Sequence, residues 1–222
     1  MKRFFYFLLI FFIVSNAKAQ SLPFWNDIQQ FKKQDSISFP ASGQILFIGS
    51  SSFTFWKDVN DYFPGYHILN RGFGGSQLTD LIRYRYEVIY PYQPRQIVMY
   101  CGENDFAAND TITPATVTNR FITLFQLIRA KYPTVPFAYV SMKPSPSRKH
   151  LMEKFETTNK QIEVFLKTQK SAIFIDVFNK MLQANGQPMD DIFVGDNLHM
   201  NAQGYTIWQK VIKPYLRKSK KK

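Results

Sequence analysis

The chain has 222 residues, a formal net charge of +12 at pH 7 and a single cysteine, Cys101. One cysteine excludes an internal disulfide, so packing must stabilise the fold. We expect Cys101 to be a buried structural thiol, with a reactive thiol as the alternative. The basic charge comes without any recognition motif for nucleic acid, so we expect no nucleic-acid partner.

The first residues, 1–19, have the pattern of a secretory signal peptide. Lys2 and Arg3 give a positive start, residues 4–14 form an apolar run, and residues 17–19 read Ala-Lys-Ala, which is a cleavage-site pattern. The apolar run is shorter than the roughly 20 residues of a membrane-spanning helix. An uncleaved N-terminal anchor is the alternative. We therefore expect export to the periplasm or out of the cell.

The mature chain, residues 20–222, contains no repeat, linker or low-complexity segment before its end, which predicts one domain. Residues 217–222 read Arg-Lys-Ser-Lys-Lys-Lys and form a basic tail, which we expect to be solvated. The alternative is weak contact with an anionic surface of lipid or polysaccharide, which salt would screen. No feature of the sequence indicates the oligomeric state.

Short apolar runs alternate with longer amphipathic stretches along the mature chain. The apolar runs predict strands at residues 44–48, 67–70, 96–100, 137–141 and 173–177. The amphipathic stretches predict helices at residues 53–62, 77–90, 114–132, 147–168 and 202–216. This alternation predicts an α/β fold in which a parallel sheet lies between two layers of helices. Ligands of such sheets bind at the carboxyl ends of the strands.

Two helix starts carry clear capping signals. Thr113 precedes Pro114, which is the pattern of an N-cap followed by proline at the first helical position. Asn201 is a good N-cap for the last predicted helix, so His199 should lie in the loop before that helix.

Three serines follow the first predicted strand, in the sequence Gly49-Ser50-Ser51-Ser52. A serine at a strand-to-helix turn presents its hydroxyl and backbone N–H to the cleft, where the helix N-terminus favours a developing oxyanion. The G-x-S-x-G elbow of α/β-hydrolases is not matched, because Phe53 stands at the second glycine position. Taken alone, this stretch favours a capped turn without catalysis over a nucleophile.

Two later loops offer hydrogen-bond donors for the same oxyanion. Residues 70–76 follow the second predicted strand, and Gly75 there can expose its backbone N–H. Asn104 follows the third strand and carries a side-chain amide, while Asp105 is expected to order that loop. Ordinary tight turns are the alternative for both loops. The first loop is not a dinucleotide fingerprint, because Gln77 occupies its third glycine position.

An acid and a histidine stand close together near the C-terminus, in the sequence Asp196-Asn197-Leu198-His199. In a turn, this spacing lets the carboxylate accept from one imidazole nitrogen while the other nitrogen faces a serine. The remaining histidines, His67 and His150, are expected to be structural or solvated. Asp191 is the reserve candidate for the acid.

The order and placement of these blocks resemble the SGNH (GDSL-type) hydrolase family, over residues 44–216. That family is named for a serine, a glycine, an asparagine and a histidine in separate blocks, matched here by Ser51, Gly75, Asn104 and His199. The resemblance implies a flavodoxin-like three-layer α/β/α sandwich with a five-stranded parallel sheet. It also implies ester hydrolysis by Ser51, His199 and Asp196 without a metal or cofactor, with an oxyanion hole made by Ser51, Gly75 and Asn104.

One position departs from the family pattern. The first block of the family usually reads G-D-S, and Ser50 stands here in place of the aspartate. That aspartate is not a triad member, so the assignment of Ser51 as nucleophile is retained, with Ser50 or Ser52 as the alternatives. The support of the turn and the shape of the pocket are left open by this substitution.

Three further side chains are candidates for substrate binding. Trp56 and Phe73 could line an acyl or sugar pocket, with core packing as the alternative for each. Arg148 follows the fourth predicted strand and could reach the cleft, with a stiff proline-shaped loop as the alternative. No metal-binding or phosphate-binding motif is present, so no metal or nucleotide site is indicated.

These features predict an exported serine esterase that hydrolyses acetyl or short-chain acyl esters, with O-deacetylation of carbohydrate as the first choice. Cleavage of lysophospholipid or another lipid ester is the alternative within the enzyme class. A protein of the same fold that binds polysaccharide or membrane without catalysis is the alternative outside it.

Overall fold

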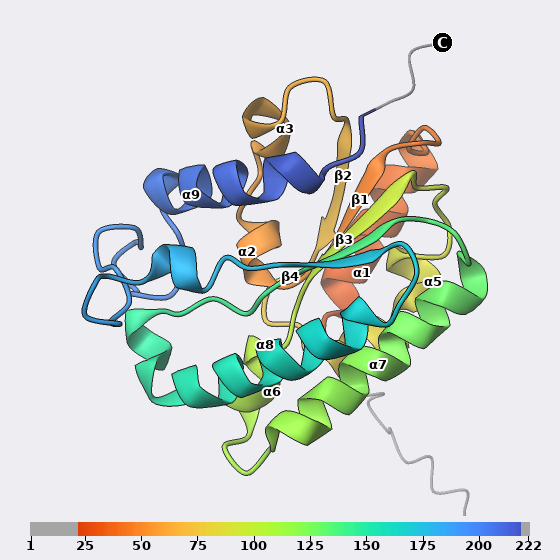
Figure 1. Cartoon of the computed structure of the whole chain (residues 1–222). Coiled ribbons are helices and arrows are strands. Elements are labelled where there is room, and N and C mark those ends of the chain that lie inside the picture. Colours follow the sequence, from red (N-terminus) through yellow and green to blue (C-terminus); the bar gives the residue numbers. More distant parts are fainter. Residues whose placement is uncertain (1–21, 219–222) are drawn as a thin grey trace, which may run out of the picture.

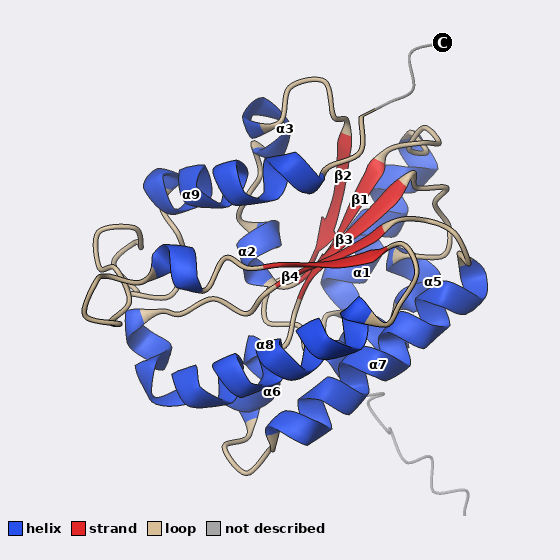
Figure 2. Ribbon diagram, in the orientation of Figure 1, coloured by secondary structure: helices blue, strands red, loops and turns tan. Residues whose placement is uncertain are grey.

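The computed structural model describes residues 22–218, so the predicted signal peptide and residues 219–222 of the basic tail lie outside the described residues. A sheet of five parallel strands runs through the middle of the molecule in the order β2-β1-β3-β4-β5. Figures 1 and 2 show helices on both sides of it. The strands are β1 (Ile45–Gly49), β2 (Ile68–Gly72), β3 (Gln96–Tyr100), β4 (Phe137–Val140) and β5 (Ala172–Ile175). The predicted three-layer α/β/α fold is confirmed.

The side chains of each central strand alternate between two apolar clusters, one on each face of the sheet. Leu46 and Ile48 of β1 pack with helices α1, α4, α5, α7 and α8, whereas Ile45 and Phe47 pack with α2, α3 and α9. All five residues of β1 are buried. In a strand that is covered on both faces, apolar and polar residues do not alternate, because every side chain faces a layer of helices. The predicted strands are therefore continuous apolar runs.

The helices differ from the predicted ones mainly by being divided. The range 53–62 overlaps two short helices, and 77–90 contains two more. The ranges 147–168 and 202–216 each overlap an α-helix that adjoins a 3-10 turn. The elements in these ranges are α2 (Ser51–Thr54), α3 (Val59–Tyr62), α4 (Leu78–Arg83), α5 (Arg85–Val88), η1 (Pro146–Leu151), α8 (Met152–Lys167), α9 (Ala202–Ile212) and η3 (Lys213–Tyr215). Pro214 accounts for the last division, because proline cannot donate the hydrogen bond that would continue α9.

The remaining elements include one predicted helix and three unpredicted ones. The predicted helix 114–132 is observed as α7 (Pro114–Lys131). Sequence reasoning missed α1 (Trp25–Ile37), α6 (Glu103–Ala108) and the turn η2 (Asn179–Met181). Only Ile28 of α1 is buried, so that helix has no apolar stripe from which to predict it.

Both predicted caps are confirmed. The Thr113 hydroxyl accepts a hydrogen bond from the backbone N–H of Thr116 at 3.2 Å. The Asn201 side-chain oxygen accepts from the N–H groups of Gln203 and Gly204 at 2.9 and 3.2 Å. Asn201 therefore fixes the start of α9 and, with it, the end of the loop that carries His199.

Cys101 is a buried free thiol, as predicted for a structural cysteine. Burial raises the pKa of the thiol well above its usual value, which disfavours the reactive thiolate. Near the C-terminus, the backbone of Arg217 is bound to the rest of the fold. Its N–H donates to the Gln96 side chain and its carbonyl accepts from Arg95, each at 2.8 Å. The expected solvated tail can therefore begin only after Arg217. Across residues 22–218, every helix is too short or too polar to cross a bilayer.

The end of β1 requires a residue without a side chain at position 49, which is Gly49. Its φ of +144° lies in a region that residues with side chains avoid, and a Cβ there would meet the Tyr100 carbonyl oxygen at 1.8 Å. This close approach lets the chain turn from β1 into α2 directly beside the end of β3. The turn carrying Ser51 therefore depends on Gly49.

We expect Gly49→Ala to lower the free energy of unfolding by at least about 3 kcal/mol, because the added Cβ would displace the backbone of β3. Gly43→Ala is the matched control, since Gly43 also has positive φ (+77°) but has no atom within 4 Å of the added Cβ. The control should cost only about 1–2 kcal/mol. Urea unfolding followed by circular dichroism measures both, and equal losses would contradict the steric explanation.

Candidate active site

A serine and a distant acid-histidine pair form one hydrogen-bonded row of three side chains. Ser51 is the first residue of α2, directly after β1, and His199 and Asp196 lie in the loop before α9. The Ser51 hydroxyl oxygen is 3.0 Å from His199 Nε2, and His199 Nδ1 is 2.5 Å from the Asp196 carboxylate. If Nδ1 donates to the carboxylate, Nε2 is free to accept the proton of the hydroxyl. This is the geometry that general-base activation of a serine requires.

The loop that holds the histidine is organised by the Asp196 carboxylate. One oxygen accepts from the backbone N–H groups of Leu198 and His199, both at 2.9 Å, and the other faces the His199 ring. Asn197 between them has positive φ, which closes the turn. Desolvation raises the pKa of Asp196, but these hydrogen bonds outweigh it and lower the pKa to about 2. The carboxylate is therefore ionised and can orient the imidazole.

An aromatic residue that the sequence analysis did not single out lies against the histidine. Phe55 follows α2, and its ring meets the His199 ring edge to face with centroids 4.6 Å apart. Its side chain is also 51% exposed, so one part of the ring supports the imidazole and another faces solvent. The sequence gives one hint of this contact. Phe55 is four residues after Ser51, about one turn of a helix, and residues at that spacing lie on the same side of a helix.

The backbone N–H groups of Ser51 and Gly75 have no hydrogen-bond partner among the described residues. Ser51 opens α2, and the first N–H of a helix has no acceptor within the helix. Gly75 has φ +83° in the loop after β2, and its N–H makes no hydrogen bond to residues 22–218. A Cβ added at the neighbouring Gly74 would lie 3.8 Å from the Ser51 Cβ, so this loop passes close to the serine.

The third expected donor, Asn104, is placed near the same loop by α6. Its side-chain NH₂ donates to the Ser76 carbonyl at 3.1 Å, and its side-chain oxygen accepts from Arg148 at 2.7 Å. One N–H of the amide thus remains for a further acceptor. The next residue, Asp105, orders the loops as expected, because its carboxylate accepts from the Leu78 N–H and from Arg120.

The turn at Ser50 is supported by main-chain contacts. The Ser50 N–H donates to the Tyr100 carbonyl at 3.0 Å, and the Gly49 carbonyl accepts from the Phe73 N–H at 2.9 Å and from the Ser76 hydroxyl at 3.2 Å. The Ser50 side chain makes no capping hydrogen bond to α2. The backbone pairing at the ends of β1 and β3 therefore holds the turn before Ser51 in place, although position 50 carries a serine and not the aspartate of the family pattern.

Arg148 lies beside Asn104 and belongs to a buried charged cluster. Its guanidinium donates to the Glu103 carboxylate at 3.1 Å as well as to Asn104, and the Lys143 ammonium is 3.4 Å from the same carboxylate. Burial raises the pKa of Glu103, but the two cations outweigh it and leave the pKa below its usual value. Burial also lowers the pKa of Lys143, which Glu103 partly offsets. Sequence reasoning did not identify Glu103 or Lys143, since neither spacing nor periodicity marks them.

Two sequence-based expectations for the substrate pocket are wrong. Trp56 and Phe73 have no exposed surface, so neither can contact a substrate in this structure. Trp56 stacks on Tyr205 at 4.8 Å in one core cluster, and Phe73 packs against Phe24 at 5.4 Å in the other. Their apolar character reflects the two faces of the sheet, which is the packing alternative named above.

The other histidines and the reserve acid lie outside the hydrogen-bonded row. His67 and His150 are exposed, and Asp191 is exposed with only its backbone carbonyl bound by Asn201. Among residues 22–218, no three His, Cys, Asp or Glu side chains gather into a set that could hold a metal ion.

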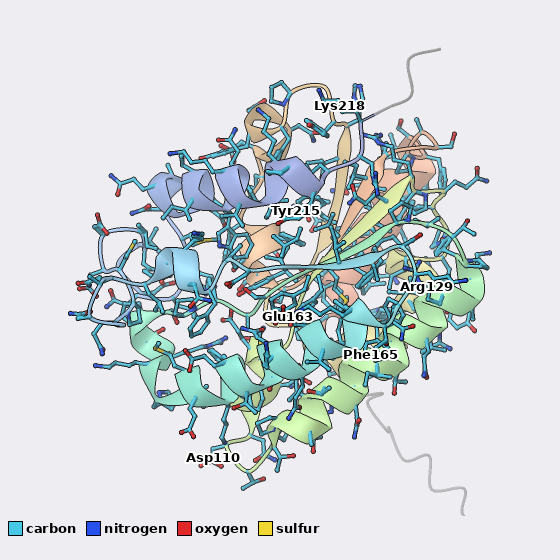
Figure 3. The ribbon with its side chains drawn as sticks, in the orientation of Figure 1. Asp110, Arg129, Glu163, Phe165, Tyr215 and Lys218 are labelled. Carbon is cyan, nitrogen blue, oxygen red and sulfur yellow. The ribbon has the colours of Figure 1, made fainter. Side chains whose placement is uncertain are left out.

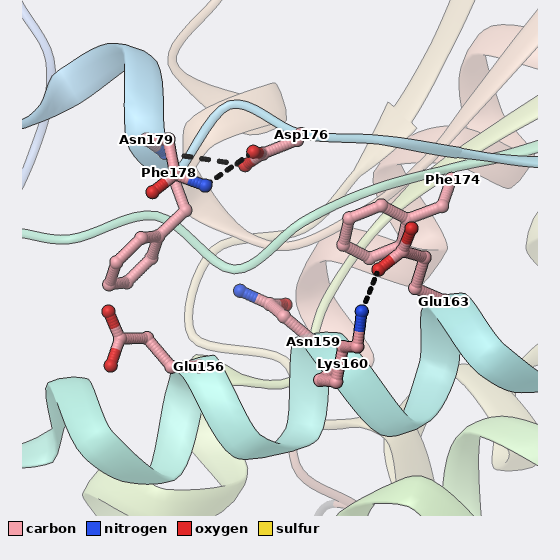
Figure 4. A pocket seen from close by; sticks show the side chains of 8 residues that line it. All are labelled: Glu156, Asn159, Lys160, Glu163, Phe174, Asp176, Phe178 and Asn179. Carbon is pink, nitrogen blue, oxygen red and sulfur yellow. Dashed lines mark hydrogen bonds and ion pairs between the residues drawn. The ribbon is translucent and has the colours of Figure 1, made fainter.

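A groove at the β5 edge of the sheet, about 300 Å³ in volume, is separate from this row. Figure 4 shows two pairs among its side chains, Lys160 with Glu163, at 3.3 Å, and Asn179 with Asp176, at 2.6 Å. It is lined by Glu156, Asn159, Lys160, Glu163, Phe174, Asp176, Phe178 and Asn179.

Comparisons with known proteins identify the family and the fold of the chain. The family model described as GDSL-like Lipase/Acylhydrolase family matches residues 35–207. A search of curated proteins found no match. Among solved structures, a GDSL-like lipase from Bacteroides thetaiotaomicron is 20% identical with a TM-score of 0.72, covering 85% of this chain and 96% of that chain.

Two further solved structures carry names from carbohydrate chemistry. An acetyl-xylooligosaccharide esterase from Geobacillus stearmophilus is 12% identical with a TM-score of 0.62, covering 81% of this chain and 96% of that chain. A carbohydrate esterase family 3 protein from Talaromyces cellulolyticus is 15% identical with a TM-score of 0.62, covering 78% and 96%. At these identities the likeness shows the fold.

The lowered pKa of Asp196 predicts a pH-dependent contribution to stability. The group is ionised in the folded state down to about pH 2, so its contribution is present above its unfolded pKa near 4 and is lost as the pH falls toward 2. Asp196→Asn should therefore destabilise the protein at pH 6 and have a smaller effect at pH 2.5. Urea unfolding at both pH values measures this.

Asp191→Asn is the control for that experiment, because it removes an exposed carboxylate nearby that accepts no hydrogen bond from a described residue. We expect little change at either pH. A destabilisation by Asp196→Asn that is equally large at pH 2.5 would contradict the hydrogen-bond explanation of the lowered pKa.

Proposed function

Because the chain belongs to the GDSL-like lipase/acylhydrolase family and is an ester-hydrolysing enzyme, we propose that Ser51 is its nucleophile. His199 is then the general base, and Asp196 orients the imidazole. The observation that carries this proposal is the pair of contacts of one ring: His199 Nε2 to the Ser51 hydroxyl at 3.0 Å and Nδ1 to the Asp196 carboxylate at 2.5 Å.

The proposed reaction proceeds through an acyl-enzyme. Ser51 attacks the ester carbonyl while His199 Nε2 takes its proton, and the imidazolium is stabilised by the Asp196 carboxylate. His199 then gives the proton to the leaving alcohol. Water, activated by the same imidazole, attacks the acyl-serine and releases the acid, which restores the Ser51 hydroxyl.

The oxyanion formed in each step needs hydrogen-bond donors that are in place before the charge develops. We assign this role to the backbone N–H groups of Ser51 and Gly75 and to the remaining side-chain N–H of Asn104. Two of these groups have no acceptor among the described residues, and all three follow the carboxyl ends of neighbouring strands. Each such donor is typically worth a factor of about 10²–10³ in kcat.

We propose acetyl or short-chain esters of carbohydrate as the substrates. A groove of about 320 Å³ is lined by residues that include Lys149, Gln187 and Asp190, and such polar groups can hydrogen-bond sugar hydroxyls. Ser147, beside the groove wall, donates its N–H to the carbonyl of Asn197 in the histidine loop at 3.1 Å. The names of the two carbohydrate-directed neighbours are in line with this choice.

A second candidate is a lipid ester such as a lysophospholipid. Phe55 at the histidine and Val194 in the same loop are both exposed apolar side chains, which favour contact with an acyl chain. The basic residues near the C-terminus favour an anionic surface. Export through a cleaved signal peptide, to the periplasm or the cell exterior, is part of the proposal and rests on the sequence pattern of residues 1–19.

Ser51→Ala should lower kcat for an aryl acetate by at least about 10⁴-fold, because the nucleophile is removed. Release of the aryl alcohol by the purified chain starting at residue 20 measures this. Ser50→Ala and Ser52→Ala are the matched controls in the same turn and should retain most of the activity. Full activity in Ser51→Ala, or loss of activity in Ser52→Ala alone, would remove the assignment of Ser51.

A panel of esters separates the two substrate classes. Acetylated oligosaccharides should be hydrolysed with kcat/KM at least about tenfold above that for lysophospholipid or dodecanoyl esters, because the groove next to Ser147, which contacts the histidine loop, is lined by polar side chains. The reverse order would favour the lipid candidate. Failure to hydrolyse any ester, together with no labelling of Ser51 by a fluorophosphonate, would favour a non-catalytic binding protein.

A further inference from the structure

We propose that Arg148 is a positioning residue that holds the Asn104 amide in the orientation needed to donate a hydrogen bond to the oxyanion. This inference rests on the proposed function, since it concerns the oxyanion donors of the same reaction. It replaces the direct contact with substrate that the sequence suggested for Arg148.

Arg148 and the Ser76 carbonyl both favour the same orientation of the Asn104 side-chain amide. Arg148 carries only donors, and its Nη2 is 2.7 Å from Oδ1 of Asn104. The Ser76 carbonyl is only an acceptor, and it receives Nδ2 of Asn104 at 3.1 Å. Turning the amide over would place its NH₂ against the guanidinium and its oxygen against a carbonyl. The second N–H on Nδ2 is thereby directed away from both partners and is available to a ligand.

The guanidinium is itself fixed by a buried carboxylate. Arg148 Nη1 donates to Oε2 of Glu103 at 3.1 Å, and the Arg148 side chain is only 16% exposed. Glu103 accepts in addition from the Tyr100 hydroxyl and from the Lys143 backbone N–H at 3.0 Å, while the Lys143 ammonium lies 3.4 Å from Oε2. A carboxylate held from several sides leaves the arginine little freedom, so the orientation of Asn104 is set in advance of substrate binding.

The element that carries Arg148 also contacts the histidine loop. Arg148 belongs to η1, which follows β4, and the N–H of its neighbour Ser147 donates to the Asn197 carbonyl at 3.1 Å. Asn197 lies between Asp196 and His199 in the sequence. One short turn therefore braces both the proposed oxyanion donor and the loop of the proposed base.

The same contacts disfavour a direct role in binding substrate. Both terminal nitrogens of Arg148 are already engaged by Glu103 and Asn104, and its charge faces a carboxylate. A substrate anion would have to displace one of these contacts. The expected effect of Arg148 is thus on kcat through Asn104, with little effect on KM.

The test is a double-mutant cycle with kcat and KM measured for an aryl acetate. Asn104→Ala should lower kcat by about 10²-fold, as for loss of one oxyanion donor. Arg148→Ala should lower kcat by about tenfold with KM changed by less than about twofold. In the Asn104→Ala background, removing Arg148 should lower kcat by less than about twofold further, because its target is gone.

Arg129→Ala is the matched control. Arg129 likewise donates through both terminal nitrogens to fixed acceptors, the carbonyls of Val135 at 2.5 Å and Ser171 at 2.9 Å. These acceptors precede β4 and β5, at the end of the sheet opposite the proposed site, and Figure 3 shows Arg129 on α7. Its loss should affect stability and leave kcat unchanged.

Arg148→Lys keeps the experiment decisive if Arg148→Ala does not fold. The ammonium retains the ion pair with Glu103, but it lacks the planar fork that reaches both partners, so kcat should still fall by at least about threefold at a melting temperature near that of the wild type. The same cycle with Asn104→Ala is then run with Arg148→Lys.

Two outcomes would overturn the inference while leaving the proposed function intact. One is an effect of Arg148 on kcat that is equally large in the Asn104→Ala background, and the other is an effect mainly on KM. Full activity in Arg148→Lys would show that only the positive charge of Arg148 matters, and this result would also overturn the inference. Failure of the proposed function would be recognised separately, by activity retained in Ser51→Ala.

Discussion

The site depends on the close approach of β1 and β3 at their carboxyl ends. The Tyr100 carbonyl oxygen occupies the space that a side chain at Gly49 would need, and it accepts the N–H of Ser50. This contact forces the chain to turn immediately after β1, so that α2 begins at Ser51. The same end of β3 leads through Gly102 into α6 and so places Asn104. Because both strands are buried on both faces, neither can shift to relieve the contact.

The proposed catalytic residues near this contact lie in two different electrostatic environments. The proposed base and acid lie in an exposed loop, where hydrogen bonds lower the pKa of Asp196 to about 2 and keep it ionised. The proposed oxyanion donor Asn104 lies instead beside a buried cluster of Glu103, Lys143 and Arg148, in which the carboxylate lies next to two cations. Buried charges are costly unless they are paired, so the loss of one member of this cluster would leave another charge without compensation.

The sequence predicted more of the fold than of the surroundings of the site. The strands were found within about two residues, as expected for boundaries read from apolar runs, because residues buried on both faces must be apolar throughout. The helix 53–62 was wrong in extent because the chain leaves α2 after Thr54, where burial of Trp56 beneath α9 overrides helical periodicity. Trp56 and Phe73 lie in opposite core clusters and so line no pocket, because an aromatic residue near a catalytic motif in sequence carries no information about which way its side chain faces.

By itself the sequence determined the class of fold and the residues able to supply a nucleophile, a base, an acid and oxyanion donors, since these follow from residue chemistry and from positions at strand ends. The tertiary structure alone decided that the Ser51 hydroxyl lies 3.0 Å from His199, that Phe55 contacts that imidazole and that Arg148 faces Asn104. Contacts of this kind join segments separated by up to 148 positions in the chain. They depend on the register and twist of the sheet, and no local pattern of residues encodes those.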